Sequence, residues 1–265
     1  MTEQMETAVA AAQAYEELHV EALFRQWVEP VLDAAGVVAG CRVLDVACGT
    51  GILSRGARAR VGPTGAVTGL DIDAGMLTVA QRLEPGVDWV EGNAAALPFG
   101  DDEFDAVVSQ FGLMFLPDPA GAVREMLRCA SPGSTVVVAV WDSLERSAAY
   151  PVIVDLLDRR AGAQAADALR APFVLGDTDE LRGVFERGGA SSVSISTLVG
   201  TARFPSVRSM VEADLRGWLP VMGVSLDEEL VESILEDAEV ALDTYVGDDG
   251  EMVFDAPAHI VTAQS

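Results

Sequence analysis

V-L-D-V-A-C-G-T-G, residues 43–51, is the stretch that decides the fold. An apolar strand pattern over 41–47 stops at a turn spaced by Gly49 and Gly51, and a helical pattern follows over 51–60. Glycine at these two positions lets the backbone approach a ligand closely. Because ligands of doubly wound sheets bind beyond the carboxyl ends of the strands, this stretch predicts a nucleotide site.

The alternation of strands and helices continues to residue 141. Asp73 is expected to cap one helix, and Asp118 followed by Pro119 is expected to begin another. Nearly continuous apolar strands that alternate with helices are typical of a parallel sheet covered on both faces. The strands expected after the first are residues 66–72, 87–92, 104–110 and 134–141.

The pattern loosens after Trp141, and the remaining elements are expected to complete the sheet and cover it. The chain is predicted to be an α/β protein with a Rossmann-like, doubly wound, mostly parallel seven-stranded sheet and helices on both faces. The later elements are helices over 147–170 and 178–187, a strand over 191–199, two apolar helical stripes, the second with a capping box at 225–228, and an edge strand over 258–264. The expected parts are an N-terminal helical cap (1–40), a core (41–204), a helical lid insertion (205–250) and a closing strand (251–265).

Composition excludes several classes of function. The 17 basic residues are all Arg, so Schiff-base chemistry on Lys is ruled out. Against them stand 42 acidic residues and a net charge of −25, which argues against nucleic acid or an anionic membrane as a partner. Three Cys and two His have no metal-ligand spacing, so no metal site is expected. Few cysteines and no apolar span predict a cytoplasmic protein without membrane insertion.

Two carboxylates distinguish the nucleotides that the turn could bind. Asp71, at the end of the second strand, is placed to bind ribose hydroxyls. Asp45, just before the turn, would repel a pyrophosphate by roughly 4 kcal/mol at about 4 Å and an effective dielectric near 20. Ser54 replaces the third glycine of the dinucleotide fingerprint. The set favours a cationic cofactor such as S-adenosylmethionine, although Asp45 could instead serve only to cap backbone amides of the turn.

Residues 41–141 resemble class I S-adenosylmethionine-dependent methyltransferases, and most of all the small-molecule branch related to ubiquinone and menaquinone biosynthesis methyltransferases. Motifs in this order are specific for fold and cofactor and not for substrate. The segments that carry the resemblance are V-L-D-V-A-C-G-T-G (43–51), G-L-D-I-D-A-G-M-L (69–77), V-E-G-N-A-A-A-L-P-F (90–99), F-D-A-V-V-S-Q-F-G-L-M-F-L-P-D (104–118) and R-C-A-S-P-G-S-T-V-V-V-A-V-W (128–141).

The resemblance implies a role for each matching residue. Asp45, with the turn that contains Ala47, Gly49, Thr50 and Gly51, would hold the methionine part of the cofactor. Asp71 would bind the ribose, with Ile72 and Met76 packing on the adenine, although Met76 could equally be ordinary core. Asn93 and Ala94 would meet the adenine edge, and Gln110 and Phe111 would close over the methionyl end. The family often has Asp where this chain has Asn93, and an amide can still accept a hydrogen bond there.

The sequence names no clear catalytic base. Methyl transfer from a sulfonium mainly requires alignment and exclusion of water, and a base is needed only if the acceptor must lose a proton. His19 is the most interesting candidate, although a packing role is the simpler interpretation; His259 is expected to be structural and Cys48 a small spacer. Weak candidates for binding the acceptor are Tyr15, His19, Met114 and Trp218.

The function predicted first is S-adenosylmethionine-dependent methyl transfer to a small, largely apolar or aromatic acceptor, with S-adenosylhomocysteine as product. The same fold and cofactor site reused for a non-methyl reaction is an alternative. Two further alternatives are an NAD(P)-dependent oxidoreductase and a non-catalytic cofactor-sensing module. The sequence leaves open the acceptor, the atom that is methylated and whether the chain forms a homodimer.

Overall fold

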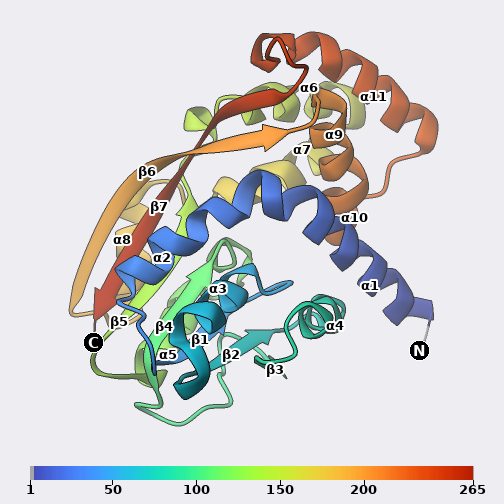
Figure 1. Ribbon diagram of the computed structural model, residues 1–265. Coiled ribbons are helices and arrows are strands. Elements are labelled where there is room, and N and C mark those ends of the chain that lie inside the picture. Colours follow the sequence, from blue (N-terminus) through green and yellow to red (C-terminus); the bar gives the residue numbers. More distant parts are fainter. Residues whose placement is uncertain (1–2, 265) are drawn as a thin grey trace.

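Seven strands form one sheet in the order β3-β2-β1-β4-β5-β7-β6. The computed structural model describes residues 3–264 (Figure 1). The first five strands are parallel, and β7 runs antiparallel to both of its neighbours. This confirms the predicted fold class. The strands are β1 (Arg42–Val46), β2 (Ala66–Asp71), β3 (Asp88–Glu91), β4 (Phe104–Gln110), β5 (Ala130–Trp141), β6 (Ser192–Phe204) and β7 (Met252–Gln264).

The prediction that the closing strand lies at the edge of the sheet is wrong. β7 pairs with β5 from Val136↔Ala263 to Trp141↔Ala258 and with β6 along its whole length. It is also longer than the expected 258–264. The physical reason is its burial, since nearly every side chain of β7 is covered, whereas β6 alternates between half-buried and exposed residues. The edge position therefore belongs to β6.

Helices cover both faces of the sheet. α2 and α3 pack together on one face, and α5 and α8 pack together on the other (Figure 1). The predicted caps are confirmed: the Asp73 carboxylate accepts from the amides of Gly75 and Met76, and the Asp118 carboxylate accepts from Gly121. These helices are α2 (Val28–Ala34), α3 (Ile52–Val61), α4 (Ala74–Leu83), α5 (Pro119–Cys129) and α8 (Thr178–Arg187).

A continuous helical segment precedes the sheet. α1 (Glu3–Tyr15) leads into the π-helical η1 (Glu16–Phe24), the short η2 (Arg25–Trp27) and then α2. α1 packs on α4, and the contact is close because Gly75 has no side chain: a Cβ there would lie 2.7 Å from the carbonyl carbon of Ala8. The N-terminal helix is thus held over the carboxyl ends of the first strands (Figure 1).

A second group of helices lies beside the far end of the β6–β7 pair (Figure 1). This group combines helices that precede β6 in the sequence, α6 and α7, with helices that follow it, α9 to α11. α6 and α7, which the sequence division assigned to the core, pack with α10 and α11 of the 205–250 segment. Asp227, not Ser225, caps α11, so the predicted capping box is wrong. The helices are α6 (Tyr150–Ala161), α7 (Ala163–Arg170), α9 (Val207–Glu212), the π-helical η7 (Ala213–Trp218), α10 (Leu219–Val221) and α11 (Glu228–Ala241); short 3-10 turns are η3 (Gly62–Thr64), η4 (Leu113–Phe115), η5 (Leu144–Arg146), η6 (Ala171–Phe173) and η8 (Asp243–Tyr245).

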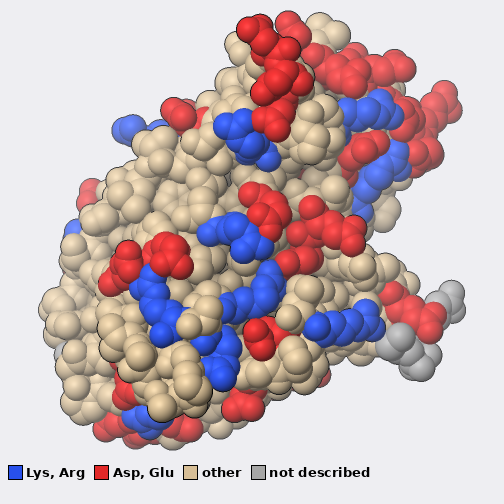
Figure 2. Space-filling view, viewed as in Figure 1, with Lys and Arg blue, Asp and Glu red and all other residues tan. Residues whose placement is uncertain are grey.

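Acidic side chains gather over this second group of helices, with arginines between them (Figure 2). Arg216 pairs with Glu228 and Glu232, and Arg208 also pairs with Glu232. Exposed pairs of this kind contribute little to stability, and the excess of acid faces solvent. Across residues 3–264, no helix has the length and apolar character needed to span a membrane.

Candidate active site

A cleft opens where the carboxyl ends of β1, β2 and β4 meet. The loops that follow these strands form its floor, and the N-terminal helical segment contributes Tyr15 and Phe24 to its wall. This is the edge at which doubly wound sheets bind ligands. The residues of the sequence prediction that line the cleft are Asp45, Ala47, Gly49, Thr50, Asp71, Ile72, Met76, Gln110, Phe111, Tyr15 and Trp218.

Two loops of the cleft floor adopt backbone conformations that L-residues rarely take. Ala47, just after β1, has φ 56°, and Phe111, just after β4, has φ 57°. The loops touch, since a Cβ added to Gly112 would lie 2.6 Å from the Cβ of Ala47. Such strain persists only where the surrounding structure fixes it, and it concentrates at functional sites.

Asp45 lies at the wall of the cleft and is fully buried, and one of its carboxylate oxygens has no partner within residues 3–264. Its Oδ2 accepts a hydrogen bond of 2.6 Å from the Ser54 hydroxyl, and its Oδ1 has no partner among the described residues. Burial raises the pKa of Asp45 to about 7, and the nearby Asp71 carboxylate adds to this. A cation at the free oxygen would favour the ionised form. Ser54, which replaces the third fingerprint glycine, therefore holds the acid in place.

Asp71 is fixed by the backbone of the two neighbouring loops. Its Oδ2 accepts from the Gly49 amide at 2.8 Å and its Oδ1 accepts from the Asp73 amide at 2.9 Å. Burial also raises the pKa of Asp71. A carboxylate has further lone pairs that can accept from ribose hydroxyls. The amide of Gly49 is thus bound by Asp71 and not by Asp45.

The two glycines of the turn have different roles. Gly49 has φ 56° and lines the cleft, and a Cβ there would meet no heavy atom within 4 Å. Gly51 has φ 84°, and a Cβ there would lie 2.3 Å from the Trp89 ring. Gly51 lies outside the lining of the cleft. It makes room for a tryptophan rather than for a ligand.

Three buried polar atoms in this cleft lack a partner among the described residues: Asp45 Oδ1, Thr50 Oγ1 and Gln110 Oε1. The Gln110 amide nitrogen donates to the carbonyl of Phe24 at 3.2 Å, which aims the side chain. Most buried polar atoms in proteins have partners, so orphans that cluster in a cleft fit a polar ligand. An ammonium, a carboxylate and hydroxyls are the groups that this set would bind.

The residues predicted to contact the adenine are only partly in the lining of the cleft. Ile72 is 72% exposed at the mouth of the cleft, and Met76 both lines the cleft and packs against the small cluster around Val79. Asn93 and Ala94 lie outside the lining, and the Asn93 Oδ1 accepts from the Ala95 amide at 2.9 Å. These assignments to the adenine edge stay predictions.

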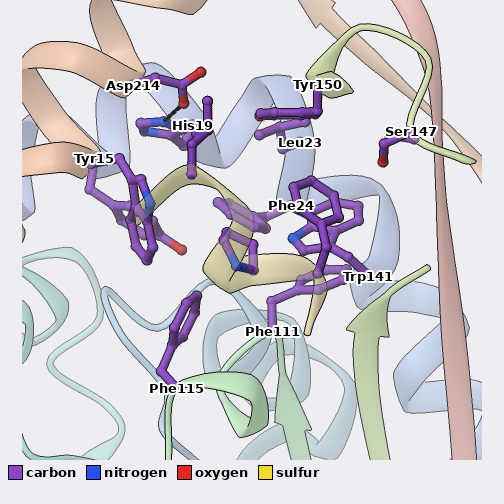
Figure 3. Close-up of a pocket in the computed structure, with 15 residues that line it drawn as sticks. Tyr15, His19, Leu23, Phe24, Phe111, Phe115, Trp141, Ser147, Tyr150 and Asp214 are labelled. Atoms are coloured by element: carbon purple, nitrogen blue, oxygen red, sulfur yellow. Dashed lines mark ion pairs between the residues drawn. The ribbon is translucent and has the colours of Figure 1, made fainter. Parts of the chain in front are cut away.

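A second cavity, which we call the aromatic cavity (Figure 3), shares part of its lining with the cleft. Its volume is about 70 Å³. Phe111 stacks on Trp141 with ring centroids 4.0 Å apart, which fixes one wall. The wall shared with the cleft consists of Tyr15, Phe24, Phe111, Phe115 and Trp218; the remaining lining is His19, Leu23, Trp141, Ser147, Tyr150, Leu169, Pro172, Phe173, Asp214 and Ala256.

The predicted acceptor residues are mostly brought together here. Tyr15, His19 and Trp218 line the aromatic cavity, whereas Met114 is buried outside both linings and the adjacent Phe115 takes its place. His259 is structural, as expected: its Nδ1 contacts the Thr197 hydroxyl and its Nε2 faces the Gly176 carbonyl.

Asp214 is the main residue that sequence reasoning missed. Its carboxylate lies 3.6 Å from His19 Nε2, and both side chains are buried, at 7% and 4% exposure for His19 and Asp214 (Figure 3). The available indication was an acid within an apolar helical stripe, three residues after Val211 and four before Trp218. The sequence gives no comparable indication for Phe24, Trp141 and Tyr150, because aromatic residues in helices and strands usually belong to the core.

Comparison with known proteins agrees with this geometry. Residues 44–138, which run from β1 into β5, match the family model described as a methyltransferase domain. The resemblance to class I S-adenosylmethionine-dependent methyltransferases is thereby confirmed for this segment, and the sheet order agrees with it.

Several relatives of this segment are bacterial quinone methyltransferases by name. A demethylmenaquinone methyltransferase of Renibacterium salmoninarum is 48% identical over 115 residues, 43% of this chain and 47% of that protein. A ubiquinone/menaquinone biosynthesis C-methyltransferase of Hahella chejuensis is 43% identical over 122 residues, 44% of this chain and 49% of that protein. The chain thus spans about half the length of the curated relatives it matches.

The similarity of fold extends further than the similarity of sequence. The structure of a putative methyltransferase from an antibiotic biosynthesis pathway of Anabaena variabilis superposes with a TM-score of 0.66 at 18% identity. It covers 89% of this chain and 96% of that one. At this identity the match shows the fold alone, and it extends well beyond the segment that matches the family model.

Proposed function

We propose that this protein transfers a methyl group from S-adenosylmethionine to a small, largely aromatic acceptor. The single observation that carries the proposal is the unpartnered oxygen of the buried Asp45 carboxyl at the wall of the cleft, beside the fixed Asp71 carboxylate. Both acids lie at the carboxyl ends of adjacent strands, as a ribose and an adjoining cation require.

The same observation separates this cofactor from a nicotinamide dinucleotide. A pyrophosphate at the turn would meet the buried Asp45 carboxyl, and among residues 3–264 no Lys or Arg lines the cleft to offset its charge. S-adenosylmethionine brings an ammonium and a sulfonium, which a carboxylate attracts. The orphan atoms of Thr50 and Gln110 fit the polar methionyl end.

The protein's own residues then position the reactants and exclude water. When bound, S-adenosylmethionine supplies an activated methyl group at its sulfonium. Gln110 in the cleft and Phe111 at the boundary with the aromatic cavity orient the donor end. The stacked pair of Phe111 and Trp141 fixes the wall against which an acceptor lies. Direct displacement needs this alignment more than it needs functional groups.

The aromatic cavity supports a flat apolar acceptor, and the names of the relatives support a quinone-like one. Its volume of about 70 Å³ is below the roughly 150 Å³ of a cavity that admits benzene. The walls must therefore move before an acceptor enters. We place this motion in the segment 205–250, which supplies Trp218 and Asp214, so that it acts as a lid.

The proposal is tested by transfer of label. The protein is incubated with a panel of reduced naphthoquinones and simple phenols and with methyl-labelled S-adenosylmethionine at a concentration that saturates only the wild type. Asp45→Asn is the variant with the weakened cofactor site, and Asp105→Asn, at the opposite end of the strands, is the control. Labelled product from the wild type and control alone supports methyl transfer. Acceptor consumed without label would support a non-methyl reaction instead. The cytoplasmic location and a homodimer stay predictions from the sequence.

A further inference from the structure

His19 and Asp214 join two segments that depart from regular α-helix. His19 lies on η1 and Asp214 on η7, and both segments are π-helical. Such segments are rare and occur frequently at functional sites. The two segments approach closely, since a Cβ added to Gly217 would lie 3.6 Å from the His19 ring. The irregular windings thus bring an imidazole and a carboxylate together at the wall of the aromatic cavity.

The pair is incomplete as a structural ion pair. His19 Nδ1 and Asp214 Oδ2 are buried and have no partner among the described residues. The buried His259 differs, because both of its ring nitrogens are bound. Leaving two polar atoms unpaired in an apolar cavity is unfavourable, and a ligand with a polar group would relieve it.

The groups that face the pair come from two other parts of the chain. Tyr15 of α1 stacks on the His19 ring with centroids 5.6 Å apart. Tyr150 of α6 lines the same cavity, and burial and the Asp214 carboxylate raise the pKa of its hydroxyl. Burial raises the pKa of Asp214, and His19 opposes this. Glu16, next to Tyr15, is paired with Arg55 instead.

Resting on the proposed function, we propose that His19 is the general base of the reaction, that Asp214 positions it, and that the acceptor carries an acidic phenolic or enolic hydroxyl. With Nε2–H directed to Asp214, Nδ1 is the acceptor nitrogen of the neutral ring. It is the atom without a partner, and His19 is part of the cavity lining.

The step balances without a further reactant. The O–H bond of the acceptor breaks, and its proton passes to His19 Nδ1. The electron pair left on the acceptor forms the new bond to the methyl carbon, from the oxygen or from a conjugated ring carbon. The S–C bond breaks, and its electron pair stays on sulfur. Methylation at carbon is completed when that carbon loses its hydrogen and the hydroxyl is restored. Asp214 stabilises the imidazolium that forms.

The test uses 4-nitrophenol, whose phenolate absorbs visible light and whose neutral form does not. The wild type, His19→Gln, Asp214→Asn and Asp214→Glu are titrated with it, with and without S-adenosylhomocysteine. Asp237→Asn, which removes an exposed pair with Arg160 on the outer helices, is the control. Far-ultraviolet spectra and thermal unfolding establish that each variant is folded. Calorimetry with S-adenosylhomocysteine reports the cofactor site separately.

The proposal predicts that the wild type and the control bind the phenolate below the pH at which free 4-nitrophenol ionises. In His19→Gln the ionisation midpoint of bound 4-nitrophenol should rise by about 1–3 pH units, with affinity for S-adenosylhomocysteine unchanged. Asp214→Asn should shift it part of the way and Asp214→Glu should restore it. The proposal is overturned if the wild type binds only the neutral form, binds none, or matches His19→Gln. Loss of S-adenosylhomocysteine binding in the wild type would instead overturn the proposed function.

Discussion

The Ser54 hydroxyl donates a hydrogen bond of 2.6 Å to one oxygen of the buried Asp45 carboxyl and leaves the other oxygen free. Ser54 stands in the first turn of α3, nine residues after an acid at the centre of the sheet. One residue thus fixes the side chain that gives the cleft its preference for a cation. Charge-assisted hydrogen bonds of this kind are among the stronger ones in proteins.

Asp45→Asn is expected to weaken binding of S-adenosylhomocysteine by about 10- to 100-fold, because one charge-assisted hydrogen bond is worth about 1.5–3 kcal/mol. Calorimetry measures the change. Ser54→Ala should weaken binding less, since the carboxylate stays but is no longer held. Equal affinity in wild type and Asp45→Asn would mean that the carboxylate does not contact the ligand.

The affinity for S-adenosylhomocysteine should depend on pH through Asp45. The pKa of Asp45 is about 7 in the free protein because the group is buried. A ligand ammonium binds the ionised form, so affinity should rise with pH and level off above about 7. The slope below that value should disappear in Asp45→Asn. A flat profile for the wild type between pH 5 and 8 would contradict the assignment.

In the absence of ligand, the ionisation of Asp45 should lower the stability of the protein, whereas it should strengthen binding of the ligand. Folding raises the pKa of Asp45, so its ionisation is disfavoured in the folded chain. The free energy of unfolding should therefore lose a contribution as the pH rises from the ordinary carboxyl value near about 4 to about 7. Asp71, raised in the same direction, adds to this trend. Urea unfolding of wild type and Asp45→Asn across this range measures it, and a smaller loss is expected for the variant.

The two glycines of the turn should separate stability from binding. Gly51→Ala drives a Cβ toward the Trp89 ring as well as straining a positive φ, so it should lower the free energy of unfolding by about 2–5 kcal/mol. Gly49→Ala has open space and should cost about 1–2 kcal/mol from backbone strain alone. Because Gly49 lines the cleft, its variant should lose more ligand affinity. Similar losses of stability in the two variants would contradict the role given to Trp89.

The N-terminal helix should respond to crowding at Gly75. Gly75→Leu places a side chain where the backbone of Ala8 lies, so α1 should separate from α4. Hydrogen exchange in α1 should then speed up, with β1 and β4 unchanged, and S-adenosylhomocysteine should bind more weakly because Tyr15 is displaced. Arg82→Gln, which lies on α4 like Gly75, is the control. Unchanged exchange in α1 would show that this contact does not hold the helix.

Much of the fold follows from local sequence patterns. Strands β1 to β5 and the caps at Asp73 and Asp118 were predictable because parallel strands are continuously apolar and caps are short-range. The order of β6 and β7 was not, because which strand is covered depends on neighbours far away in the sequence. The polar residues that alternate along β6 could have indicated that this strand lies at the edge of the sheet.

The site divides in the same way. Asp45, Asp71 and the turn come from one sheet edge and were predictable together. The role of Gly51 depends on Trp89, thirty-eight positions along the chain, and the partner of His19 lies on a distant helix, so neither could be inferred from spacing. Phe115 in place of Met114 reflects the direction of a 3-10 turn, which a pattern of apolar residues does not specify.

The central claim is that the cleft binds a cationic nucleoside and not a pyrophosphate. Calorimetric titration of the purified chain with S-adenosylhomocysteine, and separately with NADH and NADPH, tests it most directly. The account predicts binding of S-adenosylhomocysteine alone, with affinity weakened in Asp45→Asn by the factor given above. Binding of a nicotinamide dinucleotide, or of neither ligand class, would contradict it.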